Sequence, residues 1–136
     1  MSYEYFLQAH LLGEDQPIST AMIVQVFAPY ITHREEAFMD LEFDDSHQCT
    51  VYLDQESPTT SHMTISRPCD DQRLGACIYE VMQLGNFVFF EPDGKHPILL
   101  TPGALEHMPP DMIDSLGDPV IARNKEEFLE FYFNNR

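Results

Sequence analysis

The chain has 136 residues and a formal net charge of −16, with 23 acidic residues against seven Lys and Arg. Because like charges repel, this balance disfavours nucleic acid and anionic membranes as partners and favours cationic proteins. The few basic residues form no cluster, and no stretch approaches the roughly 18 apolar residues of a membrane span.

The N-terminal part predicts one strand and one helix. Residues 3–12 are aromatic and apolar and end in turn-forming residues, as is typical of a strand. Apolar residues then recur at helical spacing over 23–30. We expect Ser19 or Thr20 to cap this helix and Pro29 to distort or end its last turn.

Three short strands are predicted next, over residues 39–44, 49–54 and 62–66, because apolar and polar residues alternate in each of them. Short loops separate these strands. They therefore favour an antiparallel meander with one face on the core and the other face wet.

A second helix is predicted after Pro68, with Asp70 or Asp71 as its cap and an apolar stripe that runs to Leu84. We expect this helix to end at Gly85. The next segment, Phe87-Val88-Phe89-Phe90, is continuously apolar, as expected of a strand buried on both faces, and Glu91-Pro92-Asp93-Gly94 is a turn.

The tail is interrupted more often. We expect a short returning strand at 98–100, a short helix within 108–117, an extended segment at 119–122 and a terminal helix from Asn124 to Phe133. The whole chain, residues 1–136, is therefore predicted to be a single α+β domain. It has an antiparallel sheet with helices packed on one face, in the order β-α-β-β-β-α-β-β plus a helical tail.

The acidic residues are concentrated between Glu35 and Glu56, where eight carboxylates follow one another without any Lys or Arg. Side chains two apart in a strand share a face, so Asp40, Glu42 and Asp44 are expected to line the wet face of the sheet. Tyr52 and Asp54 of the next strand are expected to share that face. No basic residue nearby in the sequence neutralises it.

The row formed by Asp40, Glu42 and Asp44 is called the acidic ladder below. Three interpretations of this ladder are open: an ordinary solvated face, a partner-binding face and a divalent-metal site. A strand splays its carboxylates apart, whereas a metal needs them to converge, so we expect no metal. An aromatic side chain is a common interface anchor. The partner-binding residues are accordingly predicted to be Asp40, Glu42, Asp44, Tyr52 and Asp54.

No catalytic residue and no cofactor are predicted. Glycine-rich phosphate loops and the G-x-S-x-G motif are absent from the sequence, and the spacing of His47 and Cys49 does not show a Cys–His nucleophile. The alternative is a small enzyme or ligand-binding domain with a pocket between sheet and helices. In that case His10, His62 or Cys77 is expected to face the cavity.

The N-terminus has no basic or continuously apolar region of the kind that a signal peptide carries. Three cysteines without paired spacing fit reduced thiols, so we expect a cytoplasmic protein. The aromatic side chains of the tail are expected to pack in the core, with a homodimer or partner contact as the alternative; they are Phe128, Phe131, Tyr132 and Phe133.

In layout the chain resembles the small acidic immunity proteins that bacteria encode beside secreted toxins. The shared features are the acidic balance, the Asp40–Asp44 ladder, the strand and turn from Phe87 to Gly94, and the tail punctuated by Pro and Gly. The resemblance implies an inhibitor that covers the active site of a cognate cationic toxin, in many cases a nuclease. An adaptor or chaperone for a secreted effector is the other binding function with this character.

Overall fold

A computed structural model describes residues 4–91 and 96–134. Its strands are β1 (Glu4–Leu11), β2 (Glu14–Asp15), β3 (Ile18–Ser19), β4 (Ile31–Arg34), β5 (Phe38–Asp44), β6 (His47–Tyr52), β7 (Thr59–Thr60), β8 (His62–Ser66), β9 (Phe87–Phe90), β10 (Ile98–Leu99) and β11 (Val120–Ile121). Its helices are α1 (Thr20–Phe27), α2 (Gln72–Met82), α3 (Pro102–His107), α4 (Pro110–Leu116) and α5 (Lys125–Asn134), and a 3₁₀ turn, η1 (Ala28–Tyr30), follows α1. The α+β class is confirmed.

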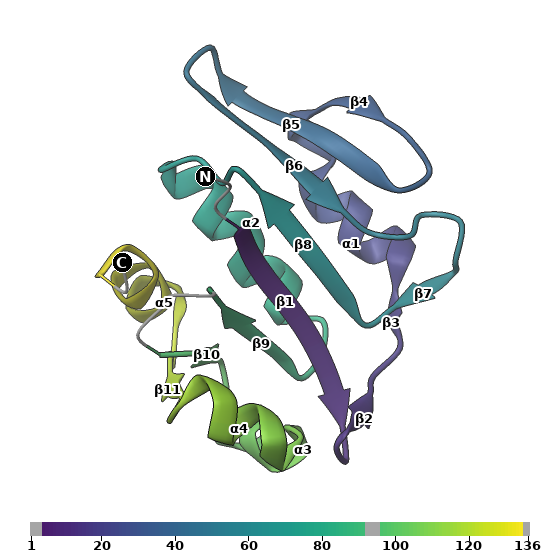
Figure 1. Cartoon of the computed structure of the whole chain (residues 1–136). Coiled ribbons are helices and arrows are strands. Elements are labelled where there is room, and N and C mark those ends of the chain that lie inside the picture. The colour runs from purple at the N-terminus through teal and green to yellow at the C-terminus, as the bar shows by residue number, and fades with distance from the viewer. Residues whose placement is uncertain (1–3, 92–95, 135–136) are drawn as a thin grey trace.

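The main sheet runs in the order β11-β10-β9-β1-β8-β6-β5-β4, with β2 paired to the end of β1 (Figure 1). All its pairings are antiparallel except that of β10 with β11. The predicted meander is confirmed, since β5, β6 and β8 are antiparallel neighbours in that order. Part of the predicted turn after β9, residues 92–94, lies outside the described residues.

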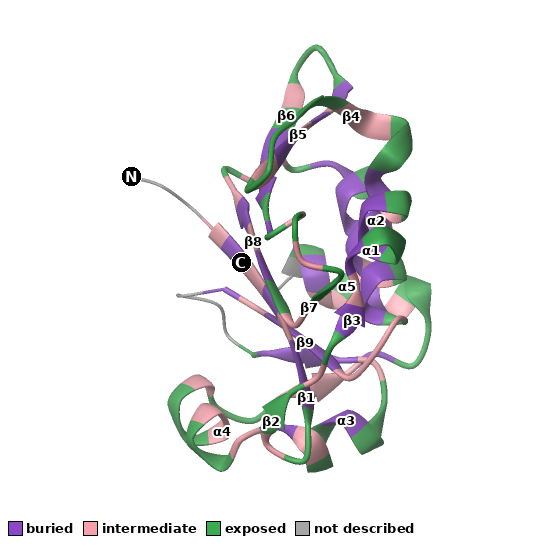
Figure 2. Cartoon of the chain, turned by 90° about the vertical axis from the view of Figure 1, so that its right-hand side faces the viewer, coloured by how far each residue is buried: buried purple, intermediate pink, exposed green. Residues whose placement is uncertain are grey.

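Helices α1, α2 and α5 cover one face of the sheet (Figure 2). As predicted, Ser19 caps α1 and Asp71 caps α2, each accepting a hydrogen bond from a backbone N–H of the first turn. Helices α2 and α5 approach so closely that a Cβ on Gly75 would lie 2.8 Å from Leu129 Cδ2. Glycine at this position therefore lets the terminal helix pack against α2.

The main core lies between the sheet and these three helices. Tyr5 of β1 packs edge-on against Phe89 at 5.1 Å and against Tyr132 of α5 at 5.5 Å between ring centroids. Phe128 and Tyr132 are fully buried, which confirms core packing for these two tail aromatics. Phe133 stays 37% exposed, and the homodimer alternative remains a prediction.

Helices α3 and α4 differ from the expectation that all helices pack on one face. Side chains alternate along a strand, so Val88 of β9 points away from the main core. With Leu99, it forms a second, smaller core against Ala104 and Met108 of the α3 region. Figure 2 shows α4 on the side of the sheet opposite α1 and α2. The continuous apolar run of β9 is explained by burial on both of its faces.

Candidate functional site

The sheet face turned away from α1 and α2, called the outer face below, is uncovered over β5, β6 and β8. Figure 1 looks onto it, with α1 and α2 behind the strands, and no described helix lies in front of them. Buried side chains of the three strands, such as Met39, Val51 and Ile65, point to the helices. The intervening residues therefore point to the outer face, and their burial ranges from buried Thr50 to exposed Tyr52.

Asp40 and Glu42 lie on the outer face, as predicted. Asp40 pairs with Thr50 of β6, and the Thr50 hydroxyl donates a hydrogen bond of 2.7 Å to the Asp40 carboxylate. Neither carboxylate has an ion-pair partner among the described residues. Together with Gln48 and Arg67 they line a depression of about 440 Å³. Arg67 is a cation beside this pair that sequence spacing did not reveal.

Asp44 departs from the predicted ladder. The register between β5 and β6 shifts between Glu42 and Asp44, and Asp44 forms an ion pair of 2.6 Å with Arg73 near the start of α2. Its other oxygen lies 2.8 Å from the His47 ring. The prediction that Asp44 continues the row without a nearby cation is therefore wrong. The cause is a bulge, which alternation alone does not reveal.

Arg73 joins two carboxylates and the β5–β6 hairpin into one network. Its guanidinium donates two hydrogen bonds to Asp71, of 2.9 and 2.8 Å, and one of 2.8 Å to the Phe43 carbonyl. Hydrogen bonds from His47, from the Ser46 backbone and from Arg73 lower the pKa of Asp44 to about 2. The hydrogen bond from Arg73 likewise lowers the pKa of Asp71.

This network also contains three side chains of types that commonly bind metal ions in proteins. Ligand atoms of Asp44, His47 and Asp71 lie within 4.8 Å of one another. However, Arg73 already supplies the positive charge for both carboxylates. The cluster therefore has a structural explanation, the attachment of the hairpin to α2.

Tyr52 and Asp54 lie in different surroundings, although they are only two residues apart: Tyr52 is the last residue of β6, and Asp54 follows the strand. Tyr52 is 46% exposed on the outer face, with its ring 6.0 Å from that of Phe38. Asp54 lies beyond the strand, where its carboxylate accepts a 3.0 Å hydrogen bond from the Glu56 backbone N–H. The structure thus brings Asp40, Glu42 and Tyr52 together on the outer face. The prediction that Asp54 shares this strand face is wrong, because β6 ends at Tyr52 and Asp54 lies in the loop beyond it.

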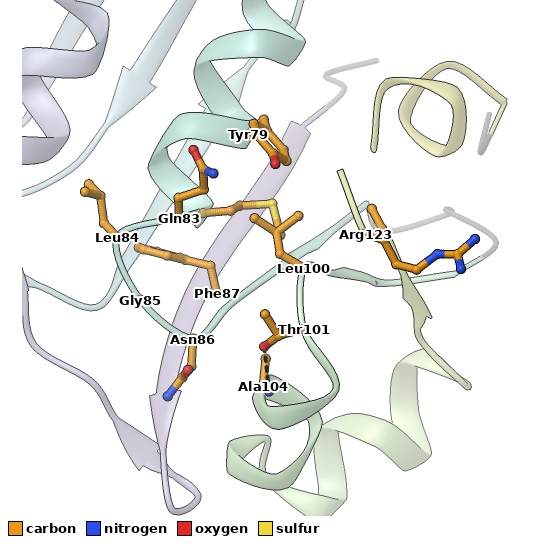
Figure 3. A pocket seen from close by; sticks show the side chains of 12 residues that line it. Tyr79, Gln83, Leu84, Gly85, Asn86, Phe87, Leu100, Thr101, Ala104 and Arg123 are labelled. Atoms are coloured by element: carbon orange, nitrogen blue, oxygen red, sulfur yellow. Dashed lines mark hydrogen bonds between the residues drawn. The ribbon is translucent and has the colours of Figure 1, made fainter. Parts of the chain in front are cut away.

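A separate pocket of about 470 Å³ lies where α2 ends and β9 begins (Figure 3). Tyr79, Phe87 and Leu100 contribute apolar walls, and Arg123 extends away from the other labelled side chains. The Arg123 guanidinium pairs with Glu127 at 3.2 Å. The described residues that line the pocket include no Asp, Glu, His or Cys.

The residues named for an enzymatic alternative do not converge on this pocket. His10 is buried in β1, and neither ring nitrogen has a hydrogen-bond partner among the described residues. Cys77 is buried in α2, where burial raises the pKa of its thiol to about 12. His62 is exposed and lines a different depression, beside Asp54.

His47 and Cys49 also fail to form a nucleophilic pair. The His47 ring is bound to Asp44, whereas Cys49 is buried and burial raises the pKa of its thiol. A catalytic cysteine needs a lowered thiol pKa, so this environment opposes nucleophilic chemistry at Cys49.

No known protein-family model matches the chain, and no curated protein matches it significantly. None of the helices in the described part of the chain combines the length and apolar character that crossing a bilayer requires.

Proposed function

We propose that this protein is a non-enzymatic binding protein that docks onto a cationic protein through its outer face. The observation that carries the proposal is the pair Asp40 and Glu42, which lie on an uncovered sheet face without ion-pair partners among the described residues. Arg67 lines the same depression without forming an ion pair with either carboxylate, so both carboxylates are available to the cations of a partner. Electrostatic complementarity of this kind accelerates the encounter with a basic partner.

The specific form of the proposal is an immunity protein that neutralises a cognate toxin by covering its active site. Its support is chemical. Sites that bind phosphate groups, including those of nucleases, use Arg and Lys to hold them. A chain with a net charge of −16 and an open face bearing carboxylates complements such a site.

The test is charge reversal on the outer face. The double variant Asp40→Lys, Glu42→Lys should bind the product of an adjacent toxin-like gene more weakly, on the order of tenfold or more, mainly through slower association. The matched control is Glu126→Lys, Glu130→Lys, which makes the same charge change at exposed positions of α5. Both affinities are measured by surface plasmon resonance at two salt concentrations.

Equal losses in the two variants would mean that only the net charge matters, and they would remove the outer face from the proposal. Deletion of the gene separates immunity from an adaptor role. Loss of an immunity protein should kill a cell that makes the toxin, whereas loss of an effector adaptor should leave it alive.

A further inference from the structure

A row of aromatic side chains crosses the outer face perpendicular to the strands. The strand registers align Phe38 of β5 with Tyr52 of β6, Tyr52 with Thr64 of β8, Thr64 with Phe6 of β1, and Phe6 with Phe90 of β9. Each of these five residues belongs to a different strand. They are adjacent in space although they span most of the described chain, so the row cannot be recognised in the sequence.

The rings of this row form two separate pairs, Phe38 with Tyr52 and Phe6 with Phe90, on either side of Thr64. The centroids of Phe38 and Tyr52 are 6.0 Å apart, and Phe6 stacks on Phe90 at 5.3 Å. Phe6, Phe38 and Phe90 are half-buried, and Tyr52 is exposed. Phe90 also packs against the second, smaller core beside α3, whereas Phe38 and Tyr52 join no described core on the outer face.

A polar row runs beside the aromatic one. The same registers align Asp40 with Thr50, Thr50 with Ser66 and Ser66 with Glu4. These residues lie two positions along each strand from the aromatic row, a separation of about 6.6 Å. The depression lined by Asp40, Glu42 and Arg67 belongs to this side of the face, so a docked cation shares it with Arg67. A side chain docked here therefore meets a ring face and a carboxylate at once.

We propose that the occupant of this face is an arginine-bearing segment of the cationic partner, with guanidinium groups stacked on Tyr52 and Phe38 and paired with Asp40 and Glu42. The inference rests on the proposed function and deepens it. A guanidinium is planar, stacks on aromatic faces and forms forked hydrogen bonds to carboxylates. A lysine ammonium is strongly hydrated and satisfies only the charge requirement.

A single-stranded nucleic acid is the other ligand that stacks on aromatic rows of open sheets. The neighbouring carboxylates oppose it, because its phosphates would lie against Asp40, Glu42 and Glu4 in a chain of net charge −16. Charge therefore selects the cationic peptide over the polynucleotide.

The experiment compares a nona-arginine with a nona-lysine peptide of equal charge, titrated into the full-length protein and measured by calorimetry at about 0.15 M salt, where exposed charges are screened. We expect the arginine peptide to bind about two- to fivefold more tightly. Tyr52→Phe should keep this preference because it keeps the ring, and Tyr52→Thr should lose it. Asp40→Asn, Glu42→Gln should weaken both peptides more than the matched control Glu126→Gln, Glu130→Gln.

Equal affinity for the two peptides, or a preference that survives in Tyr52→Thr, would overturn the inference, as would binding of oligothymidine at the same face. If the outer-face charge reversal still weakens the protein partner, the proposed function stands and only the arginine preference fails. If neutralising Asp40 and Glu42 affects neither peptides nor partner, both proposals fail.

Discussion

Asp40 and Asp44 lie four residues apart on one strand and have opposite environments. Asp44 accepts hydrogen bonds from His47 and Arg73, and together with Asp71 it attaches the β5–β6 hairpin to α2. Asp40 accepts one hydrogen bond from the Thr50 hydroxyl and faces solvent beside Glu42. Asp44 thus belongs to an ion-pair network within the fold, whereas Asp40 has no ion-pair partner among the described residues.

The difference shows that acidic charge in a sequence does not by itself mark a binding surface. A carboxylate that the fold already pairs contributes to stability. One that the fold leaves without an ion-pair partner is available to an external cation. Substitutions that separate stability from binding therefore test the comparison directly.

The largest expected effect is on stability, from Arg73→Met. The substitution removes the cation from Asp71, whose side chain is only 9% exposed, and leaves the Phe43 carbonyl without its donor. Breaking a network around a poorly exposed carboxylate is strongly destabilising. We expect the melting temperature to fall by several degrees in thermal denaturation followed by circular dichroism.

The control for this measurement is Asp40→Asn, Glu42→Gln, which removes two charges from the outer face. Its melting temperature should change by less than about 3 °C, because substitutions at solvent-facing positions outside such networks have small effects. A larger loss in this control than in Arg73→Met would reverse the comparison.

A smaller effect is expected on the pH dependence of unfolding. The pKa of Asp44 is lowered to about 2 in the folded protein, chiefly by His47, and that of Asp71 is lowered chiefly by Arg73. A lowered folded-state pKa stabilises the protein above the unfolded pKa of about 3.9, and this stability is lost as pH falls toward the folded value. Asp44 is exposed, so solvent screening reduces its contribution to this stability.

The melting temperatures of wild type and Arg73→Met should therefore converge as the pH is lowered from about 4 to about 2. Thermal denaturation of both proteins across this range measures the convergence. A constant difference between them would show that Arg73 stabilises the fold by packing, for example over the Phe43 ring, rather than through its carboxylates.

Much of the fold could be predicted because local pattern and tertiary structure agree. Alternation located β5, β6 and β8, and helical spacing with Ser19 and Asp71 as caps located α1 and α2. Strand β4 was missed, since its exposed residues show no alternation and its pairing with β5 defines it. Helix α3, which begins at Pro102 under a Thr101 cap, was also missed because six residues carry little periodicity.

The candidate site was predictable only within one strand. Alternation correctly placed Asp40 and Glu42 on the outer face. The bulge before Asp44 depends on the pairing of β5 with β6, and the ion pair with Arg73 joins residues 29 apart in the sequence. The aromatic row depends on the register of five strands. The one indication of this row in the sequence was Tyr52, an aromatic residue at a strand position that alternation assigned to the solvent-facing side.

The most direct test of the outer face as the docking surface maps where a cation binds on the protein. The nona-arginine peptide is titrated into ¹⁵N-labelled protein, and amide shifts are followed by NMR. We expect the largest shifts along residues 38–42 and 48–52, with the Arg73 side-chain Nε–H signal unchanged. The largest shifts at Asp44, His47 and Asp71, or along the acidic residues of α5, would contradict this expectation.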